Sequence, residues 1–255
     1  MKGFFSHMRL DKFLCQRNQG TRSQVKELIR RGQVTVNGNP VKKADYSVEE
    51  DRDRVCVQGR EVTGEKYVYY MLNKPKGVVS AVRDNTAGTV VELLRPEDRR
   101  RDIFPAGRLD KDTEGLLLLT NDGGLAHKLL SPRNHVEKTY LVTPRQPLGE
   151  QEICQLEQGV EIGEERPTLS AKARKLEDGR ILLTIHEGKF HQVKRMLQAV
   201  GNGVDELKRT SFGGIALDDS LQPGEYRPLT EEELGRLREA VGREIAAEIA
   251  ADGKE

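Results

Sequence analysis

The chain has 255 residues, of which 33% are charged and 36% hydrophobic, with no tryptophan. This length is enough for one large domain or for one domain with a small appendage, and the composition excludes an intrinsically disordered chain. The 42 Lys and Arg residues and the 41 Asp and Glu residues nearly cancel, so the net charge of +1 identifies no partner. Three scattered cysteines exclude a disulfide framework and a cysteine-rich metal site.

Charge is unevenly distributed along the chain. Residues 8–60 contain 12 Lys and Arg against 7 Asp and Glu, whereas residues 218–255 contain 5 against 11. A basic front on a neutral chain indicates that this front binds a polyanion. No apolar stretch reaches the ~18 residues that a membrane span needs, and the N-terminus shows no signal-peptide pattern. We therefore expect a cytoplasmic protein with no membrane contact.

The first predicted elements are two short amphipathic helices over residues 9–19 and 22–31. Thr21 or Ser23 is expected to cap the second helix, and Gly32 to end it. In GQVTVNGNPV (32–41), the alternating valines and the Asn-Gly pair predict a strand that runs into a tight turn, and VCVQG (55–59) predicts its partner strand. We place the end of this module at residue 60 and a linker at residues 61–66.

After the linker the pattern changes to short strands and helices. Helices are predicted around residues 89–94, over 191–200 and from Thr230, where Glu233 completes a capping box. Most predicted strands alternate or are separated by turn residues, so we predict an α+β protein whose second domain, residues 67–255, is a mixed, mainly antiparallel sheet with packed helices. The predicted strands are YVYYML (67–72), VVSAV (78–82), the end of IFPAGRL (103–109), LLLLT (116–120), KTYLV (138–142), LSAKARKL (169–176) and RILLTIH (180–186).

The first module carries many cations on its two predicted helices. From charge alone, a solvated helix surface and a phosphate-binding face explain them equally well. RLDKFL and TRSQVKELIRRGQVTVNG, however, closely resemble the S4-type RNA-binding module, in which the second helix and the following turn lie against structured RNA. The resemblance implies an RNA partner for residues 8–60. The cations in question are Arg9, Lys12, Arg17, Arg22, Lys26, Arg30 and Arg31, and all of them except Arg17 are predicted to contact RNA.

Several enzyme classes are excluded by the motifs that the chain lacks. It contains no GxxxxGK[ST] for nucleotide phosphates, no GxGxxG for a dinucleotide, no HExxH or Cys/His metal spacing and no GxSxG hydrolase turn. Carboxylate chemistry without a metal or cofactor is what remains.

The stretch AGRLDKDTEGLLLLTNDG (106–123) holds the candidate carboxylate. Arg108 and Asp110 stand on alternate residues at the expected end of a strand, so both would point to one side of it, next to a segment that must be buried. Asp112 reads as a turn residue ahead of the leucines. The residues alone leave Asp110 open between a loop residue and a catalytic one.

The same stretch resembles the catalytic motif of the pseudouridine synthases, in the branch that modifies ribosomal RNA and carries one S4-type module in front. Four further segments occur in the expected order: NKPKGVVS (73–80), EKTYLV (137–142), EGKFHQVKRMLQAVG (187–201) and LKRTSFGGIALDDSLQPGEYRPLTEEE (207–233). The resemblance covers nearly the whole chain. It implies an enzyme that isomerises a uridine within RNA by breaking the C1′–N1 bond, turning the uracil and rejoining it through C5, with no cofactor and no metal.

The resemblance also implies roles for individual residues. Asp110 is the catalytic carboxylate, acting either as nucleophile at C1′ or as base at C2′, and Lys194 is the cation that keeps it ionised in a dry site. Tyr140 stacks on the flipped base, and its alternative interpretation is a core tyrosine of a strand. Arg108 holds the RNA backbone or fills the space that the uracil leaves.

Further RNA-binding positions are predicted, and each also has a simple structural explanation. Lys74 and Lys76 in the NKPKG turn could contact phosphate, although turn formation with Pro75 explains them as well. Arg195, beside Lys194, is counted among the RNA-binding residues, although on a helix it would point away from its neighbour.

Two details favour small-subunit (16S) ribosomal RNA as the substrate: the lysine after the valine in HQVKRMLQAVGN, and the ending GEYRPLTEEE. The alternatives are a large-subunit (23S) enzyme of the same family, a non-catalytic RNA-binding protein of ribosome assembly, and another S4-containing enzyme such as a methyltransferase. The intact set of Asp110, Tyr140 and Lys194 argues against the second, and the missing glycine-rich motifs against the third. We expect a monomer because no dimerisation stripe is evident.

Overall fold

The structure is a computed structural model that describes residues 7–17, 19–50, 52–62, 67–99 and 102–252. The chain forms two compact units. One comprises Met1–Val68 with Arg100–Asp102, and the other comprises Tyr69–Arg99 with Ile103–Glu255. None of the helices within the described ranges is long and apolar enough to cross a membrane.

The first unit combines two helices with short strands, as the sequence predicts. The side chain of Thr21 accepts a hydrogen bond from Gln24 N and the Gln24 side chain accepts one from Thr21 N, so Thr21 is the cap of the second helix. The predicted strand pair forms in antiparallel register, with Val34 opposite Val57. The elements are β1 (His7–Arg9), α1 (Leu10–Gln16), α2 (Arg22–Arg30), β2 (Val34–Val36), β3 (Asn39–Pro40), β4 (Ser47–Glu49), β5 (Val55–Val57) and β6 (Arg60–Glu61).

The core of the first unit comes from the residues that set the helical spacing. The buried side chains Leu10, Phe13 and Leu14 of α1 pack with Val25 and Ile29 of α2. β6 ends at Glu61 and Val62 packs against this core, so the folded module reaches beyond residue 60. Residues 63–66 of the predicted linker lie outside the described residues.

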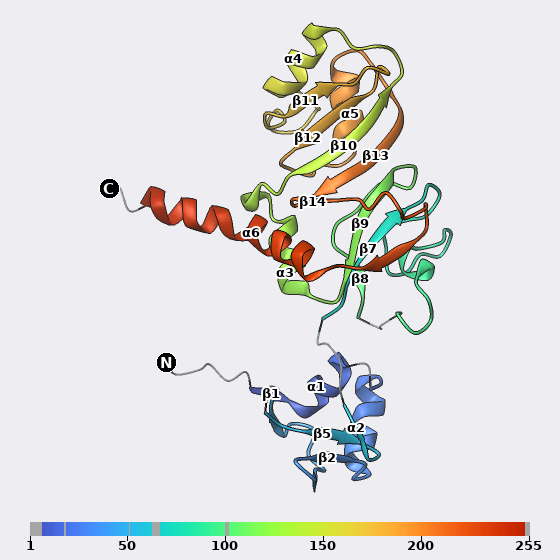
Figure 1. The fold of residues 1–255 in the computed structure, drawn as a ribbon, viewed down its shortest axis with the longest axis vertical. Helices are drawn as coiled ribbons and strands as arrows, with labels where there is room; N and C mark the ends of the chain where they lie inside the picture. The colour runs from blue at the N-terminus through green and yellow to red at the C-terminus, as the bar shows by residue number, and fades with distance from the viewer. Residues whose placement is uncertain (1–6, 18, 51, 63–66, 100–101, 253–255) are drawn as a thin grey trace. The chain divides into compact units, whose positions relative to one another are not determined.

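The second unit is built on one nine-stranded sheet (Figure 1). The hydrogen-bonded order is β11-β12-β10-β13-β9-β7-β15, with β14 on β13 and β8 on β9. Among the described strand pairs of this sheet, only β13–β9 is parallel, which confirms a mixed, mainly antiparallel sheet. The strands are β7 (Tyr69–Lys74), β8 (Phe104–Pro105), β9 (Glu114–Thr120), β10 (Lys138–Pro144), β11 (Lys172–Lys175), β12 (Ile181–Ile185), β13 (Val204–Phe212), β14 (Ile215–Ala216) and β15 (Tyr226–Pro228).

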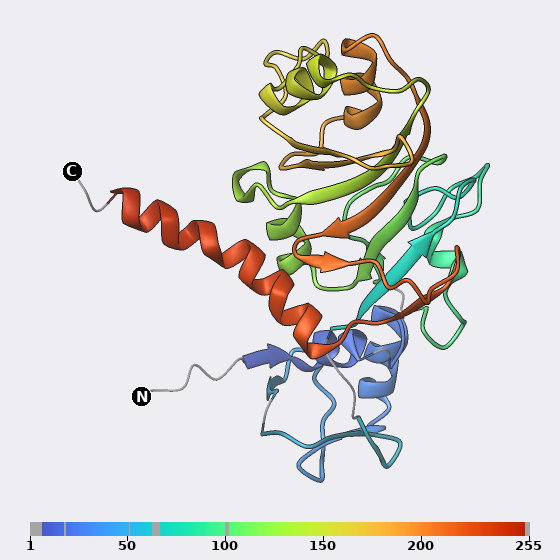
Figure 2. The same cartoon turned by 45° about the horizontal axis from the view of Figure 1, so that its top comes forward.

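Helices accompany both parts of this sheet. The two views place α3 and α6 beside the part that contains β7 and β9, and α4 and α5 beside the part that contains β10 and β12 (Figures 1 and 2). Leu116 and Leu118 of β9 pack in one buried cluster with Leu129 of α3 and Leu237 of α6. The helices are η1 (Val90–Leu93), α3 (Gly123–Leu130), η2 (Pro132–Asn134), α4 (Glu150–Gln158), α5 (Gln192–Ala199) and α6 (Glu231–Asp252).

Two predicted strands are wrong. Residues 78–82 form no strand, and Val79 makes only an isolated bridge with Thr89. The segment 103–109 is extended only at Phe104 and Pro105, after which Gly107 takes a φ of 96° and the chain becomes a loop. A left-handed residue interrupts the pleat, and so it ends the strand before Arg108. The predicted helix near residues 89–94 is the short 3₁₀ turn η1.

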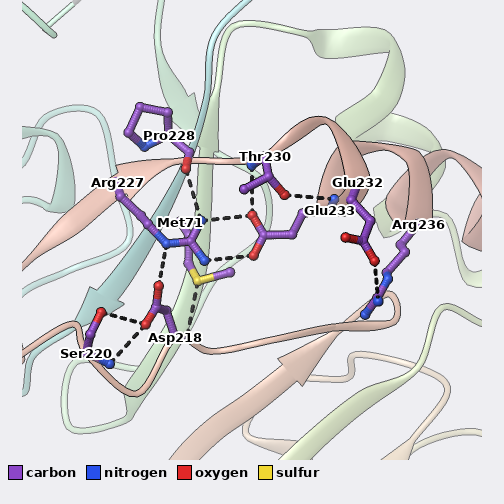
Figure 3. Close-up of polar contacts among 9 residues, drawn as sticks. All are labelled: Met71, Asp218, Ser220, Arg227, Pro228, Thr230, Glu232, Glu233 and Arg236. Atoms are coloured by element: carbon purple, nitrogen blue, oxygen red, sulfur yellow. Dashed lines mark hydrogen bonds and ion pairs between the residues drawn. The ribbon is translucent and has the colours of Figure 1, made fainter.

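A set of hydrogen bonds around the half-buried Arg227 fixes the start of α6 (Figure 3). Arg227 donates to Glu233 through both terminal nitrogens, at 2.8 and 2.7 Å, and through Nε to Asp218 at 2.5 Å. Glu233 also accepts from Thr230 N, and Thr230 Oγ1 accepts from Glu233 N, which confirms the predicted capping box. One carboxylate therefore caps the helix and ties it to Arg227 of the preceding strand β15.

Gly115, the second residue of β9, is required by a close backbone approach. Its φ is 103°, and a Cβ added there would collide with the backbone of Arg209 on the parallel strand β13. The left-handed backbone alone costs a non-glycine residue about 1–3 kcal/mol. Gly115→Ala is therefore expected to lower the free energy of unfolding by about 2 kcal/mol or more in urea denaturation. Gly123→Ala, which meets nothing within 4 Å, is the matched control and should be neutral or stabilising.

Candidate active site

A cavity of about 800 Å³ opens on the second unit. Three segments form much of its wall: residues 79–82, the loop 105–113, and residues 185–193 ahead of and into α5. The predicted residues Arg108, Asp110 and Tyr140 all line it. Residues far apart in the sequence thus meet in one concave site, which is where ligand and active sites commonly form.

The loop that carries Asp110 is held by the segment that begins at Lys74. The Ser80 hydroxyl donates to the Leu109 carbonyl at 2.8 Å and accepts from Leu109 N at 3.0 Å. Gly77 N donates to the carbonyl of Lys111 at 2.7 Å. Within the loop, Thr113 N closes a turn on the Asp110 carbonyl at 3.1 Å. These bonds fix the backbone on both sides of the carboxylate, although the loop is not a strand.

Lys74 lies beneath this loop and is fully buried, so the predicted phosphate contact is wrong for this residue. Its Nζ donates to the carbonyl oxygens of Thr113 at 2.9 Å, Pro75 at 3.0 Å and Lys111 at 3.4 Å. Burial lowers the pKa of Lys74 to about 8, although the nearby carboxylates of Asp112 and Asp110 oppose that shift. The sequence did not mark it as a loop support because its burial depends on the loop folding over it.

Lys194 of α5 bridges two carboxylates. Its Nζ lies 3.2 Å from Asp110 Oδ2 and 2.5 Å from Asp112 Oδ1. Burial lowers the pKa of Lys194, but its hydrogen bonds to Asp112 and Asp110 outweigh that effect and leave this pKa above its usual value. The structure therefore pairs the predicted cation with Asp110.

Asp112 is more than the turn residue that the sequence suggests. Its hydrogen bond from Lys194 is the shorter of the two contacts and holds the pKa of the Asp112 carboxyl below its usual range. The Asp112 side chain is 70% exposed and does not line the cavity, whereas that of Asp110 is 27% exposed and does. Asp112 is thus placed to hold the lysine, and Asp110 to meet a ligand.

His191 is a further neighbour of Asp110 that sequence reasoning missed. Its Nε2 lies 3.5 Å from Asp110 Oδ1, and its backbone is left-handed with a φ of 48°. Its ring stacks on Phe190, with centroids 3.8 Å apart. The only sequence signal was its position three residues before Lys194.

Tyr140 is buried in β10 with its side chain on the cavity wall, which two buried cations also line. Lys138 donates to Val136 O at 2.7 Å, and Arg209, opposite Tyr140 in register, donates through Nε to Leu116 O at 2.8 Å. Burial, with a smaller effect of Arg209, lowers the pKa of Lys138 to about 8. Both cations line the cavity and were missed, although Lys138 stands two residues before Tyr140 and so shares its side of the strand.

The remaining predicted RNA-binding side chains of this unit differ in how exposed they are and in whether they pair with carboxylates. Arg108 is exposed at the cavity. Lys76 is exposed but lies 3.4 Å from Glu206 and 3.6 Å from Glu114. Arg195 donates to Glu164 at 2.6 Å and to the carbonyls of Phe190 and Ile162, so its guanidinium braces neighbouring loops instead of facing the cavity.

The seven cations that the sequence marked in the first unit fall into three environments. Four of them, Arg9, Lys12, Arg22 and Lys26, line one cavity at α1 and the start of α2. Arg30 and Arg31, at the end of α2, both pair with Glu27 at 2.8 and 2.7 Å. Arg17 packs over the ring of Phe13 and reaches Glu50, inside the module. No cluster of metal-binding side chains occurs in the described parts of either unit.

Comparisons with known proteins agree with the two units. The family model described as RNA pseudouridylate synthase matches residues 68–199, and that of the S4 domain matches residues 8–55. An uncharacterized RNA pseudouridine synthase of Bacillus subtilis, YtzG, is 51% identical over 91% of this chain and 99% of its own length. The ribosomal small subunit pseudouridine synthase A of Escherichia coli is 44% identical over 90% of this chain and 100% of its own. A crystal structure of a pseudouridylate synthase, 41% identical, superposes with a TM-score of 0.64 over 90% of this chain and 99% of that one.

The buried ammonium of Lys74 predicts a pH dependence of stability. Its folded-state pKa of about 8 lies below the usual 10.5, so the unfolded state binds more protons between these values. The unfolding free energy of the wild type relative to Lys74→Met should therefore rise as the pH increases from about 8 to about 10.5, in urea denaturation at several pH values. Lys138→Met should give a difference of the same sign, since the pKa of Lys138 is also lowered to about 8. A difference that stays flat or falls over this range would refute the assignment.

Proposed function

The chain belongs to the RNA pseudouridylate synthase family, and on that premise we propose that it isomerises one uridine of small-subunit ribosomal RNA to pseudouridine, with Asp110 as the catalytic carboxylate. The observation that carries the proposal is the geometry at Asp110. A partly exposed carboxylate lies in a cavity, 3.2 Å from a lysine ammonium, with a tyrosine on the cavity wall. The relative named for the small ribosomal subunit supports the choice of RNA.

Asp110 must be ionised in either route open to it. As nucleophile it would bond to C1′ as the C1′–N1 bond breaks, and as base it would remove the C2′ proton. Lys194 supplies the positive charge that favours this ionised form when substrate excludes water. Asp112 takes the other side of the same ammonium, so Lys194 is oriented before substrate arrives.

Tyr140 offers its ring and hydroxyl to the detached base. The uracil must leave the RNA stack, and contacts in the cavity have to offset the few kcal/mol that extrusion costs. When C5 bonds to C1′, the bond from Asp110 to C1′ breaks or, in the other route, Asp110 returns the proton to C2′. The C5 proton then leaves and N1 gains one, so atoms balance without an added reactant. We place Tyr140 as the stacking residue and as the hydroxyl nearest to this proton transfer, and the buried cations Lys138 and Arg209 as its fixed neighbours.

The first unit is proposed to hold the ribosomal RNA. Four exposed cations gathered around one cavity, of which Arg9 also pairs with Asp11 at 2.8 Å, suit the phosphates of a folded RNA better than six spread along two helices. Arg30 and Arg31, which pair with Glu27, are proposed as weaker contacts. We further propose that the protein acts in the cytoplasm, where ribosomal RNA is made in bacteria such as those of its relatives, and as a monomer.

Replacing Asp110 tests the reaction. Asp110→Asn is expected to abolish pseudouridine formation in unmodified small-subunit ribosomal RNA, because an amide can act neither as the nucleophile nor as the base. Carbodiimide-dependent primer extension would map the product. Lys194→Met should lower the rate about 100-fold or more, while Lys194→Arg, which keeps the charge, should retain most of it.

Circular dichroism would establish that each variant is folded. Large-subunit RNA serves as the second substrate. If primer extension stops at a modified uridine only in the large-subunit RNA, that RNA and not the small-subunit RNA is the substrate. Stops that persist in Asp110→Asn, or no stop with either RNA, would overturn the reaction itself.

The salt dependence of RNA binding tests the first unit. Replacing both Arg22 and Lys26 by Gln is expected to reduce the slope of log K against log salt concentration by about 0.7–0.9 for each phosphate that the protein no longer neutralises. Arg31→Gln, at the C-cap of the same helix but paired with Glu27, is the matched control and should change the slope less. Equal slopes for the double variant and the wild type would remove this cavity from the RNA interface.

A further inference from the structure

Phe190 is unusual among the large apolar side chains of the described residues. It is 67% exposed, whereas Tyr46, Val82, Leu130 and Leu169, the next most exposed, lie between 42% and 44%. Scattered exposed apolar residues are normal on a protein surface, so this value alone assigns no role. The position of the ring is what makes the exposure informative, because Phe190 lines the cavity that contains Asp110.

The Phe190 ring is held in place by His191. The two rings are nearly parallel, with an angle of 18° and a centroid separation of 3.8 Å. His191 has the left-handed backbone that non-glycine residues rarely adopt, immediately before α5 begins. The same imidazole also reaches Asp110, with Nε2 3.5 Å from Oδ1. Two stacked rings therefore lie next to Asp110, with His191 against the carboxylate and Phe190 against His191.

The surroundings of this ring pair favour a nucleobase as the ligand. A base presents a flat π face that stacks on aromatic side chains in single-stranded RNA recognition. Arg108 and Lys111, both exposed, line the same cavity and can neutralise the phosphates on either side of such a base. Flipping a uridine out of the stack also leaves the neighbouring base without its stacking partner.

We propose that Phe190 and His191 form a stacking platform for the unpaired base that neighbours the target uridine in the RNA. This assignment rests on the proposed function and extends it, because it names how the enzyme holds the RNA on the rim side of Asp110. Phe190 acts as a positioning residue and takes no part in bond making. Its ring replaces the stacking that the neighbouring base loses when the uridine leaves the stack.

Four variants test the platform with unmodified small-subunit ribosomal RNA. Phe190→Ala and Phe190→Leu are expected to raise KM about 5- to 150-fold, the equilibrium equivalent of one base stacked on an aromatic side chain, with a smaller change in kcat. Phe190→Trp should restore KM to near the wild-type value. Leu169→Ala, which truncates an exposed apolar side chain outside the cavity, is the matched control and should leave KM unchanged.

The comparison of Phe190→Leu with Phe190→Trp separates stacking from packing. A leucine variant with the KM of the wild type, or a tryptophan variant as poor as alanine, would overturn the platform. So would a loss confined to kcat.

Binding measured without turnover separates this inference from the reaction. In filter binding of the same RNA, the dissociation constants of the wild type and the four variants should fall in the same order as their KM values. If the wild type forms pseudouridine but its affinity is insensitive to Phe190, the platform fails and the proposed function stands. The opposite outcome is that the wild type forms no pseudouridine, while Phe190→Ala binds the RNA more weakly than the wild type and Phe190→Trp binds it about as well. In that case the proposed function fails and stacking on this ring is supported.

Discussion

The active-site loop depends on one buried ammonium. Lys74 ends β7 inside the second unit and satisfies three backbone carbonyls, two of which belong to Lys111 and Thr113 in the loop that carries Asp110. Burying a charge is costly unless hydrogen bonds compensate, and the lowered pKa of Lys74 reflects that cost. Backbone carbonyl oxygens that are shielded from water are also costly unless they accept a hydrogen bond. The lysine and the loop therefore require each other, and the position of Asp110 follows from that mutual requirement.

The charges around Asp110 are arranged in layers of decreasing burial. Lys74 lies beneath the loop, Lys194 lies beside it, and Asp112 closes the ion pair from the solvent side. Two carboxylates around one ammonium keep that ammonium charged and fixed. Asp110 is then the carboxylate with a cavity in front of it, while Asp112 has solvent. Placement alone separates two aspartates of the same short loop, since Asp110 faces the cavity, as the proposed reaction requires, and Asp112 holds Lys194.

Rigidity of this site comes from the strand behind it. The leucines of β9 are buried on both faces, and Leu116 and Leu118 pack under α3 and α6 while the backbone pairs with β7 and β13. Gly115 allows β9 to approach the backbone of Arg209 on β13 closely, and Arg209 in turn lies opposite Tyr140 on the neighbouring strand β10. The buried side chains of Lys138, Tyr140 and Arg209 line the cavity from the neighbouring strands β10 and β13, and Phe190 lines it as an exposed side chain.

The sequence by itself determined the two-unit organisation, the capping box at Thr230 and the mainly antiparallel sheet, and through the ordered motif that resembles the pseudouridine synthases it marked Asp110 as the candidate carboxylate. Each of these follows from local spacing, capping or an ordered motif, which neighbouring residues in the chain express directly. Only the tertiary structure decided that Arg108 and Asp110 stand on a loop, that Lys74 is buried, that Asp112 shares Lys194, and that Lys138, Arg209, Ser80 and His191 belong to the site. Those facts depend on which distant strand or loop covers a polar group, and burial by distant residues leaves no periodic signal in the chain.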